Sequence, residues 1–263
     1  MKKRILGLLV GAMALVLVLA GCGQKSSQNS AKLVTSKTLT IGLEGTYAPY
    51  SYREDGKLKG FEVDLGKDLA KEMGLKVKFM PTQFDSLVAG VQSNKFDMII
   101  NNMGITKARQ KKFLFSTPYI YSQSVLITKS NNTKIKSVHD LKGVKMVEGT
   151  GTDNWIQAEK FGGKIVSSPE FATSMNMLRD GRAQATINSK EAFAYYVKQK
   201  SGADLKATDI STKDIPATKE GIMMNKDNTG LQKQTNKALE KLRQNGTLKK
   251  LSEKYFGTDI TEK

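Results

Sequence analysis

Residues 84–122 constrain the fold more than any other stretch, because a helix, a buried strand and a polar loop follow one another directly. One apolar helix face is predicted from residues spaced by three and four, namely Phe84, Leu87, Val88 and Val91. The apolar run Phe96–Ile100 is typical of a strand buried on both faces of a parallel sheet. The polar residues Asn101, Asn102 and Gly104 come next, where open α/β sheets bind ligands. The stretch therefore predicts an α/β protein with its site after this strand.

Arg109 is the unusual residue of this stretch. Thr106 is a good N-cap for a helical turn over Lys107–Phe113, which places Arg109 near the positive end of the helix dipole. Only six of the 42 basic residues are arginines, and a planar guanidinium suits a carboxylate better than a lysine does. Taken alone, the pattern also fits an ordinary surface arginine after a turn.

The pattern before this stretch supports a parallel sheet. A first strand is predicted over Thr38–Leu43, and a helix opens at Gly60-Phe61 and ends at Gly74. Alternating apolar residues then predict a strand that stops at Pro81. Residues 38–100 are thus predicted to form β-α-β-α-β with right-handed crossovers.

Residues 84–119 resemble the central motif of bacterial solute-binding proteins that deliver polar amino acids to ABC importers. The resemblance extends over roughly residues 38–258, including the C-terminal helix pair that ends in Leu251–Gly257. It implies a bilobal periplasmic-binding-protein-like fold of type II, with two α/β lobes joined by a two-strand hinge. Residues 37–121 and 222–263 would form lobe 1 and residues 122–221 lobe 2. The hinge strands would be Tyr121–Thr128 and Gly221–Asn225.

The resemblance also implies how a ligand would be bound. Arg109 would pair with the α-carboxylate, with help from the backbone N–H groups of Gly104 and of Thr150, Gly151 and Thr152. Two glycines before a helix start expose such N–H groups, although this pattern alone is weak. Tyr47 and Phe84 would enclose the body of the ligand, and Glu44 would lie near its side chain. Tyr50 is interpreted as a packing residue.

The chain departs from its family at Ser189, where most members have an aspartate that binds the α-ammonium. A serine offers a hydrogen bond without charge, and a buried ammonium needs a counter-charge. The nearest acids by motif position are Glu44 and Glu148. We expect Glu44 to be the counter-charge.

The resemblance also suggests a ligand. Asn101 and Asn102 lie where the cystine-binding branch has a similar polar pair, and the ending Leu251–Gly257 resembles that branch too. Cystine is therefore the first choice, and another polar or basic amino acid is the alternative.

The N-terminus indicates export. Three basic residues precede an apolar run over Ile5–Ala20, which predicts a signal peptide over residues 1–21. Leu19–Cys22 resembles a bacterial lipobox, so Cys22 is expected to carry lipid such as palmitate and to anchor the protein on the extracytoplasmic face of the cell membrane. Cys22 is the only cysteine, which excludes an internal disulfide. Residues 22–36 are small and polar and are predicted to be a flexible tether.

The charge leaves a second function open. Removing Lys2, Lys3 and Arg4 from the net charge of +17 leaves +14, spread over predicted helices. This favours a solvated lysine-rich surface, and the alternative is an adhesin that binds anionic surface polymers, with or without solute binding. A nucleic-acid partner is a poor fit, because no aromatic and basic binding motif is present.

An enzyme is not expected, and neither is a metal or cofactor. The single histidine, His139, precedes a predicted turn, and no nucleophile motif or metal-ligand cluster occurs in the sequence. We expect a monomer whose partners are an amino acid and a membrane permease.

Overall fold

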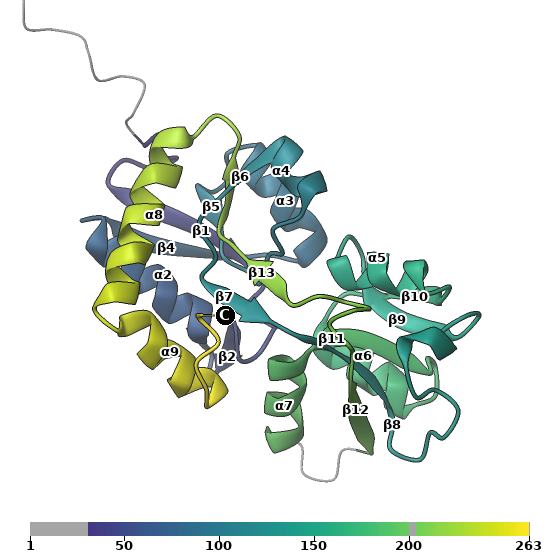
Figure 1. Ribbon diagram of the computed structural model, residues 1–263. Helices are drawn as coiled ribbons and strands as arrows, with labels where there is room; N and C mark the ends of the chain where they lie inside the picture. The colour runs from purple at the N-terminus through teal and green to yellow at the C-terminus, as the bar shows by residue number, and fades with distance from the viewer. Residues whose placement is uncertain (1–30, 200–203, 263) are drawn as a thin grey trace, which may run out of the picture. The chain divides into compact units, whose positions relative to one another are not determined.

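The computed structural model describes residues 31–199 and 204–262 and contains two five-stranded sheets, each with helices packed on it (Figure 1). The first sheet has the order β4-β1-β5-β14-β6 and the second β10-β9-β11-β8-β12. We call the units built on these sheets the first and second lobes. Their arrangement is the periplasmic-binding-protein-like α/β fold that the sequence predicts.

The first lobe begins with the predicted β-α-β-α-β unit. Its elements are β1 (Thr38–Leu43), α2 (Phe61–Glu72), β4 (Lys76–Pro81), α3 (Phe84–Gln92) and β5 (Met98–Ile99). Strand β1 pairs in parallel with both β4 and β5, which confirms the parallel prediction. The segment between β1 and α2 forms a hairpin of β2 (Tyr52–Glu54) and β3 (Lys57–Lys59), which the sequence did not predict.

Strand β5 is shorter than the predicted strand over Phe96–Ile100. Asp97, at its start, is buried and its carboxylate accepts hydrogen bonds from the backbone N–H groups of Val34 and Thr40, both at 2.7 Å. The backbone N–H of Asp97 also donates to Thr40 O at 2.9 Å, so side-chain and backbone bonds together attach this end of the strand to β1. The prediction of a flexible tether over residues 22–36 is wrong for residues 31–36, which are held against the first lobe. The Val34 N–H binds Asp97, and the backbone N–H of Lys32 donates to Asn228 Oδ1 at 3.1 Å.

The chain completes the first sheet from two distant segments. Helix α4 (Lys107–Lys112) leads into β6 (Phe113–Phe115), a strand where the sequence predicted the end of a helix. Strand β14 (Met223–Asn225) pairs antiparallel with β5 on one side and β6 on the other. Helices α8 (Thr229–Gln244) and α9 (Thr247–Phe256) then pack their apolar faces on the first-lobe core, as the resemblance implied.

The second lobe is one continuous segment of the chain. Its strands are β8 (Ser124–Lys129), β9 (Lys145–Gly149), β10 (Lys164–Ser168), β11 (Ala185–Ser189) and β12 (Leu205–Asp209). Strands β9, β10 and β11 are parallel, and β8 runs antiparallel to β11 and β12. Its helices are α5 (Asp153–Lys160), α6 (Phe171–Arg179) and α7 (Lys190–Gln199), with a short turn η1 (Val138–Asp140).

Two short strands connect the lobes. Strand β7 (Ile120–Ser122) pairs antiparallel with β13 (Thr218–Glu220), and they lie side by side between the two sheets (Figure 1). The predicted return strand over Gly221–Asn225 is therefore corrected: the connection is made by β13, and the later residues belong to β14 in the first sheet. The predicted outgoing strand over Tyr121–Thr128 is likewise divided between β7 and β8.

The predicted lipidation at Cys22 and the predicted signal peptide over residues 1–21 lie outside the described residues. None of the helices in the described ranges is long and apolar enough to cross a membrane. His139 is 66% exposed in its side chain and contacts Asp214, in agreement with its interpretation as a surface residue.

A candidate ligand site between the lobes

A cavity between the lobes collects most of the residues that the sequence singled out. Predicted residues that line it are Glu44, Tyr47, Phe84, Asn101, Asn102, Arg109, Thr152 and Ser189. Residues that were not predicted also line it, among them Asp153, Asn154, Glu170, Phe171, Asn188 and Glu220. The cavity is thus lined from both sheets and from the hinge strands. Its lining has four carboxylates and a single guanidinium.

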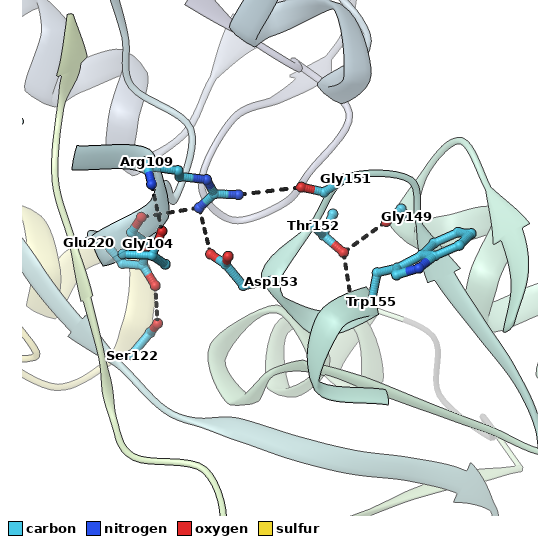
Figure 2. A network of polar contacts seen from close by, with 10 residues as sticks. Gly104, Arg109, Ser122, Gly149, Gly151, Thr152, Asp153, Trp155 and Glu220 are labelled. Atoms are coloured by element: carbon cyan, nitrogen blue, oxygen red, sulfur yellow. Dashed lines mark hydrogen bonds and ion pairs between the residues drawn. The ribbon is translucent and has the colours of Figure 1, made fainter. Parts of the chain in front are cut away.

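Arg109 is placed by the start of α4. The Arg109 N–H donates to Thr106 Oγ1 at 3.2 Å, so Thr106 is the N-cap that the sequence predicted. The guanidinium Nη1 donates to Gly104 O at 3.1 Å and to Asp153 Oδ2 at 2.5 Å, and Nη2 donates to Gly151 O at 3.4 Å (Figure 2). The guanidinium therefore lies at the junction of both lobes, with only 14% of the side chain exposed.

Asp153 is the first residue of α5 and was missed by the sequence analysis. Thr152 caps this helix by accepting from the Trp155 N–H at 3.1 Å, and it donates to Gly149 O at 2.8 Å (Figure 2). Burial raises the pKa of Asp153, while Arg109 acts to lower it. An acid in the first turn of a helix is ordinary because of the helix dipole, so its position alone gave no reason to assign a role.

The sequence predicted that the backbone N–H groups of Gly104, Thr150 and Gly151 help to bind the ligand carboxylate. The structure shows these three residues in other contacts. Gly104 and Gly151 both present carbonyl oxygens to Arg109. Thr150 is exposed and its Oγ1 lies 2.8 Å from Ser167 Oγ, away from the cavity lining. Of the Thr150–Thr152 segment, only Thr152 lines the cavity.

Glu44 and Asn101 form a reciprocal pair at the ends of β1 and β5. The Glu44 N–H donates to Asn101 Oδ1 at 2.7 Å, and Asn101 Nδ2 donates to Glu44 Oε2 at 2.8 Å. Burial raises the pKa of Glu44 to about 7, opposed by the Asn101 hydrogen bond and reinforced by the charge of Glu170. Glu44 is therefore an acid whose charge responds to a cation placed in the cavity.

Asn102 is held in a left-handed conformation, with φ at 46°. Its N–H donates to Glu62 Oε1 at 2.5 Å and to Tyr119 Oη at 3.1 Å. Burial raises the pKa of Glu62 to about 7. The side-chain oxygen Oδ1 of Asn102 is buried without a hydrogen-bond partner.

The aromatic residues Tyr47, in the segment after β1, and Phe84, the first residue of α3, line the same cavity. The Tyr47 ring stacks on Tyr50 with centroids 5.0 Å apart, and it meets the Phe171 ring of the second lobe edge-on at 5.7 Å. Its hydroxyl donates to Asn188 Oδ1 at 2.8 Å across the lobes. Phe171 begins α6 after a strand, so the rule that located Asn101 would also have found it.

Ser189 lines the cavity and is also a structural cap. Its hydroxyl accepts from the Ala192 N–H at 3.2 Å and donates to Glu191 Oε2 at 2.8 Å. The hydroxyl of Tyr50, which is fully buried, lies 2.9 Å from Ser189 Oγ. Glu148, the other acid considered for the ammonium, is 1% exposed, accepts from the Ile187 N–H and lies outside the cavity lining. The structure therefore removes Glu148 as a candidate.

Glu220 places a carboxylate on the hinge itself. It is 3% exposed, and its Oε1 accepts from Ser122 Oγ of the opposite hinge strand at 2.8 Å (Figure 2). Burial raises the pKa of Glu220 to about 8; the Ser122 bond and Arg109 lower it, and Asp153 raises it. The second oxygen, Oε2, is buried without a partner.

Comparison with known proteins identifies the family of the chain. The family model of bacterial extracellular solute-binding proteins, family 3, matches residues 39–258. A probable amino-acid ABC transporter-binding protein of Haemophilus influenzae is 41% identical over 86% of this chain and 88% of its own length. The L-cystine-binding protein TcyJ of Escherichia coli is 37% identical over 97% of this chain and 96% of its own. A solved structure of an ancestral arginine-binding protein bound to arginine has a TM-score of 0.78 and 34% identity, covering 84% of this chain and 99% of its own.

Proposed function

The chain belongs to family 3 of the bacterial extracellular solute-binding proteins, and we propose that it binds L-cystine between its lobes for delivery to an ABC importer. Amino-acid binding for such an importer is the role that the named relatives have. Cystine is preferred because the cystine-binding relative matches nearly the whole chain. A basic amino acid is the second candidate, since the arginine-binding structure shares the fold at 34% identity.

One observation carries the proposal: a buried guanidinium and several carboxylates line one cavity between the lobes. Arg109 would bind a ligand carboxylate through the charge-assisted pairing that a guanidinium favours. Tyr47 and Phe84 would enclose the body of the ligand, with Asn101, Asn102, Thr152 and Ser189 as polar contacts. Gly104, Thr150 and Gly151 would act indirectly, by fixing the loops around Arg109.

Glu44 is proposed as a counter-charge for a ligand ammonium. It lines the cavity, and its raised pKa shows that burial disfavours its charged form, a penalty that a cation would relieve. Ser189 offers a hydroxyl only, and that hydroxyl is already engaged by Glu191 and Ala192.

The remaining parts of the proposal concern the surroundings of the protein. Export through residues 1–21 and lipidation of Cys22 would hold the receptor at the outer face of the cell membrane, where a permease accepts the ligand. We propose a monomeric receptor without catalytic activity or cofactor. Nothing in the family assignment supports the adhesin alternative.

A thermal-shift screen of residues 23–263 against the twenty amino acids and L-cystine tests the proposal. A ligand at 100 times its dissociation constant adds about 2.7 kcal/mol to the free energy of unfolding. A rise in melting temperature with L-cystine, or with a basic amino acid, supports solute binding and ranks the two candidates. No shift with any of these compounds would overturn it.

A further inference from the structure

Two acceptor atoms in the cavity residues have no hydrogen-bond partner. They are Oε2 of Glu220, on the hinge strand β13, and Oδ1 of Asn102, at the end of β5. Both atoms are buried, and both residues line the cavity. Buried polar atoms are almost always hydrogen-bonded, because an unpaired one costs about 1–3 kcal/mol. Two of the four such atoms in the described residues belong to residues that line the cavity, and these two can accept a hydrogen bond from a ligand; the other two, on Glu62 and Gln157, belong to residues outside the lining.

Backbone contacts connect the residues that carry these two acceptors to the residues that bind Arg109. Gly104, whose carbonyl binds the Arg109 guanidinium, forms a β-bridge with Glu220. Its neighbour Met103 accepts the Gly221 N–H, which ties the Asn102 loop to the hinge strand. The charge of Arg109 lowers the pKa of Glu220, whereas the charge of Glu170 raises the pKa of Glu44. By the charges that act on them, the cavity acids form two groups, which we call its two acidic ends: Glu220 and Asp153 with Arg109, and Glu44 with Glu170.

We propose that Glu220, assisted by Asn102, binds the α-ammonium of the ligand whose α-carboxylate pairs with Arg109. The two groups of one amino acid are attached to the same carbon, so the sites that receive them must be neighbours. An ammonium has three donors, and Glu220 and Asn102 each offer a free acceptor to it. Glu220 thereby takes the role that the family gives to an acid at the position of Ser189.

The assignment leaves Glu44 for a second cationic group. A ligand with two such groups, one for each acidic end, matches four carboxylates around a single guanidinium. L-cystine has two ammonium groups, and L-arginine has an ammonium and a guanidinium. Amino acids with one cationic group would leave the Glu44 end without a counter-charge, so they are expected to bind more weakly.

Ligand binding at this position should change the protonation of Glu220. The charged groups around Glu220 are Arg109 on α4, Asp153 on α5 and Glu62 on α2, with Ser122 as its hydrogen-bond donor on β7. With a pKa of about 8, Glu220 is mostly protonated at pH 7. An ammonium beside it favours the carboxylate form, so binding should release a proton from this residue.

The inference rests on the proposed function, and its test separates the two. Affinity is measured by calorimetry for L-cystine and for 3,3′-dithiodipropionate, which keeps both carboxylates and lacks both ammonium groups. L-arginine and 5-guanidinopentanoate form the matching pair if the screen selects arginine. The variant is Glu220→Gln, which keeps the size of the side chain. The control is Glu148→Gln, because Glu148 is equally buried but lies outside the cavity lining.

We expect Glu220→Gln to weaken binding of the amino acid about 10- to 100-fold and to change binding of its deaminated analogue by less than twofold. Glu148→Gln should change neither. An unchanged affinity in Glu220→Gln, or an equal loss for both compounds, would overturn the inference. Binding that requires Arg109 but is indifferent to Glu220 would leave the proposed function standing.

A second measurement does not depend on the analogue or on the stability of the variant. Calorimetry of the wild-type protein at pH 7 in phosphate and in Tris, buffers with different ionisation enthalpies, counts protons released on binding. We expect a net release at pH 7, where the α-amino group of the ligand is mostly protonated before binding, and a smaller release in Glu220→Gln at the same pH. Absence of proton release in the wild-type protein would overturn the assignment of the ammonium to Glu220.

Discussion

Arg109 Nη1 and Asp153 Oδ2 are 2.5 Å apart and join α4 of the first lobe to the start of α5 in the second. Both side chains are largely buried, with 14% and 29% of their surfaces exposed. The guanidinium proposed to bind the ligand thus already has a carboxylate partner within the protein. A ligand carboxylate must share the guanidinium with Asp153 or displace it.

The ion pair should influence how the lobes associate. Asp153→Asn removes the charge of one partner in a largely buried ion pair and leaves the Arg109 charge uncompensated, so ligand-free protein should sample separated lobes more often. Small-angle X-ray scattering should show a larger radius of gyration in the variant, and saturating ligand should reduce it. Asp209→Asn is the control, because its pair with Lys190 lies within the second lobe and is well exposed. Identical radii for wild type and Asp153→Asn would show that the pair has no such influence.

Arg109→Ala should abolish most ligand binding. A charged hydrogen-bonded pair is worth about 1.5–3 kcal/mol, which corresponds to a 10- to 100-fold loss of affinity in calorimetry. Arg179→Ala serves as control, since Arg179 contacts the exposed Asp204 in the second lobe. Unchanged affinity in Arg109→Ala would reduce Arg109 to a residue that only joins the lobes.

Glu44→Gln and Ser189→Ala should act on different quantities. Glu44→Gln removes a proposed counter-charge and should weaken binding with little change in melting temperature. Ser189→Ala removes the bond that caps α7 through the Ala192 N–H, which costs roughly 0.5–2 kcal/mol of stability, and should affect binding less. Calorimetric titration of both variants measures the change in affinity, and thermal melts measure the change in stability. A larger loss of affinity in Ser189→Ala would assign the ammonium contact to the serine hydroxyl.

Stability of the ligand-free protein should fall as pH rises from 5.5 to 8.5. Burial raises the pKa of Glu44 and Glu62 to about 7 and that of Glu220 to about 8, above the value of 4.5 expected for an unfolded chain. The folded protein therefore binds more protons than the unfolded chain in this interval, and its free energy of unfolding declines with pH. Below pH 4.5 both states are protonated and the contribution of these groups is complete.

Urea denaturation at pH 5.5, 7 and 8.5 measures this slope. Glu62→Gln should flatten it, because Glu62 lies outside the cavity lining and contributes only through its buried carboxyl group. A free energy of unfolding that rises steadily over the interval, or a slope unaffected by Glu62→Gln, would contradict the assignment.

The parts of the site that the sequence predicted share one property: they depend on local patterns. Thr106 and Arg109 belong to one helix start, and Glu44 and Asn101 follow strands that their own apolar residues predict. Asp153 was missed because its partner lies 44 residues away, and its position in a first helical turn has an ordinary explanation. Glu220 was missed because Thr218–Glu220 is a polar segment, and only its pairing with β7 buries it. Contacts between residues on opposite sides of the hinge produce no periodic pattern of apolar residues in the sequence.

The division of the hinge was mispredicted for a related reason. Residues 218–225 contain both β13 and β14, which bend at Gly221 between the hinge and the first sheet. A Cβ at Gly221 would lie 2.8 Å from Ile105 Cδ1, so any larger residue would have to displace the Ile105 side chain. The sequence shows the apolar residues of this segment, but it does not show that the pairing strand changes from β7 to β5 and β6 within it.

The position of β14 between β5 and β6 has a consequence for biogenesis. The second lobe is complete once the chain has been made as far as Ile215, which is buried in its core, and its first and last strands in the chain, β8 and β12, are then hydrogen-bonded neighbours. The first lobe cannot finish its sheet until residue 225 arrives, more than 100 residues after β6. Until then β5 and β6 have free edges, which are sites for wrong pairing and aggregation. A polypeptide interrupted before residue 223 should therefore be recognised by proteases as unfinished in its first lobe, even though its second lobe is intact.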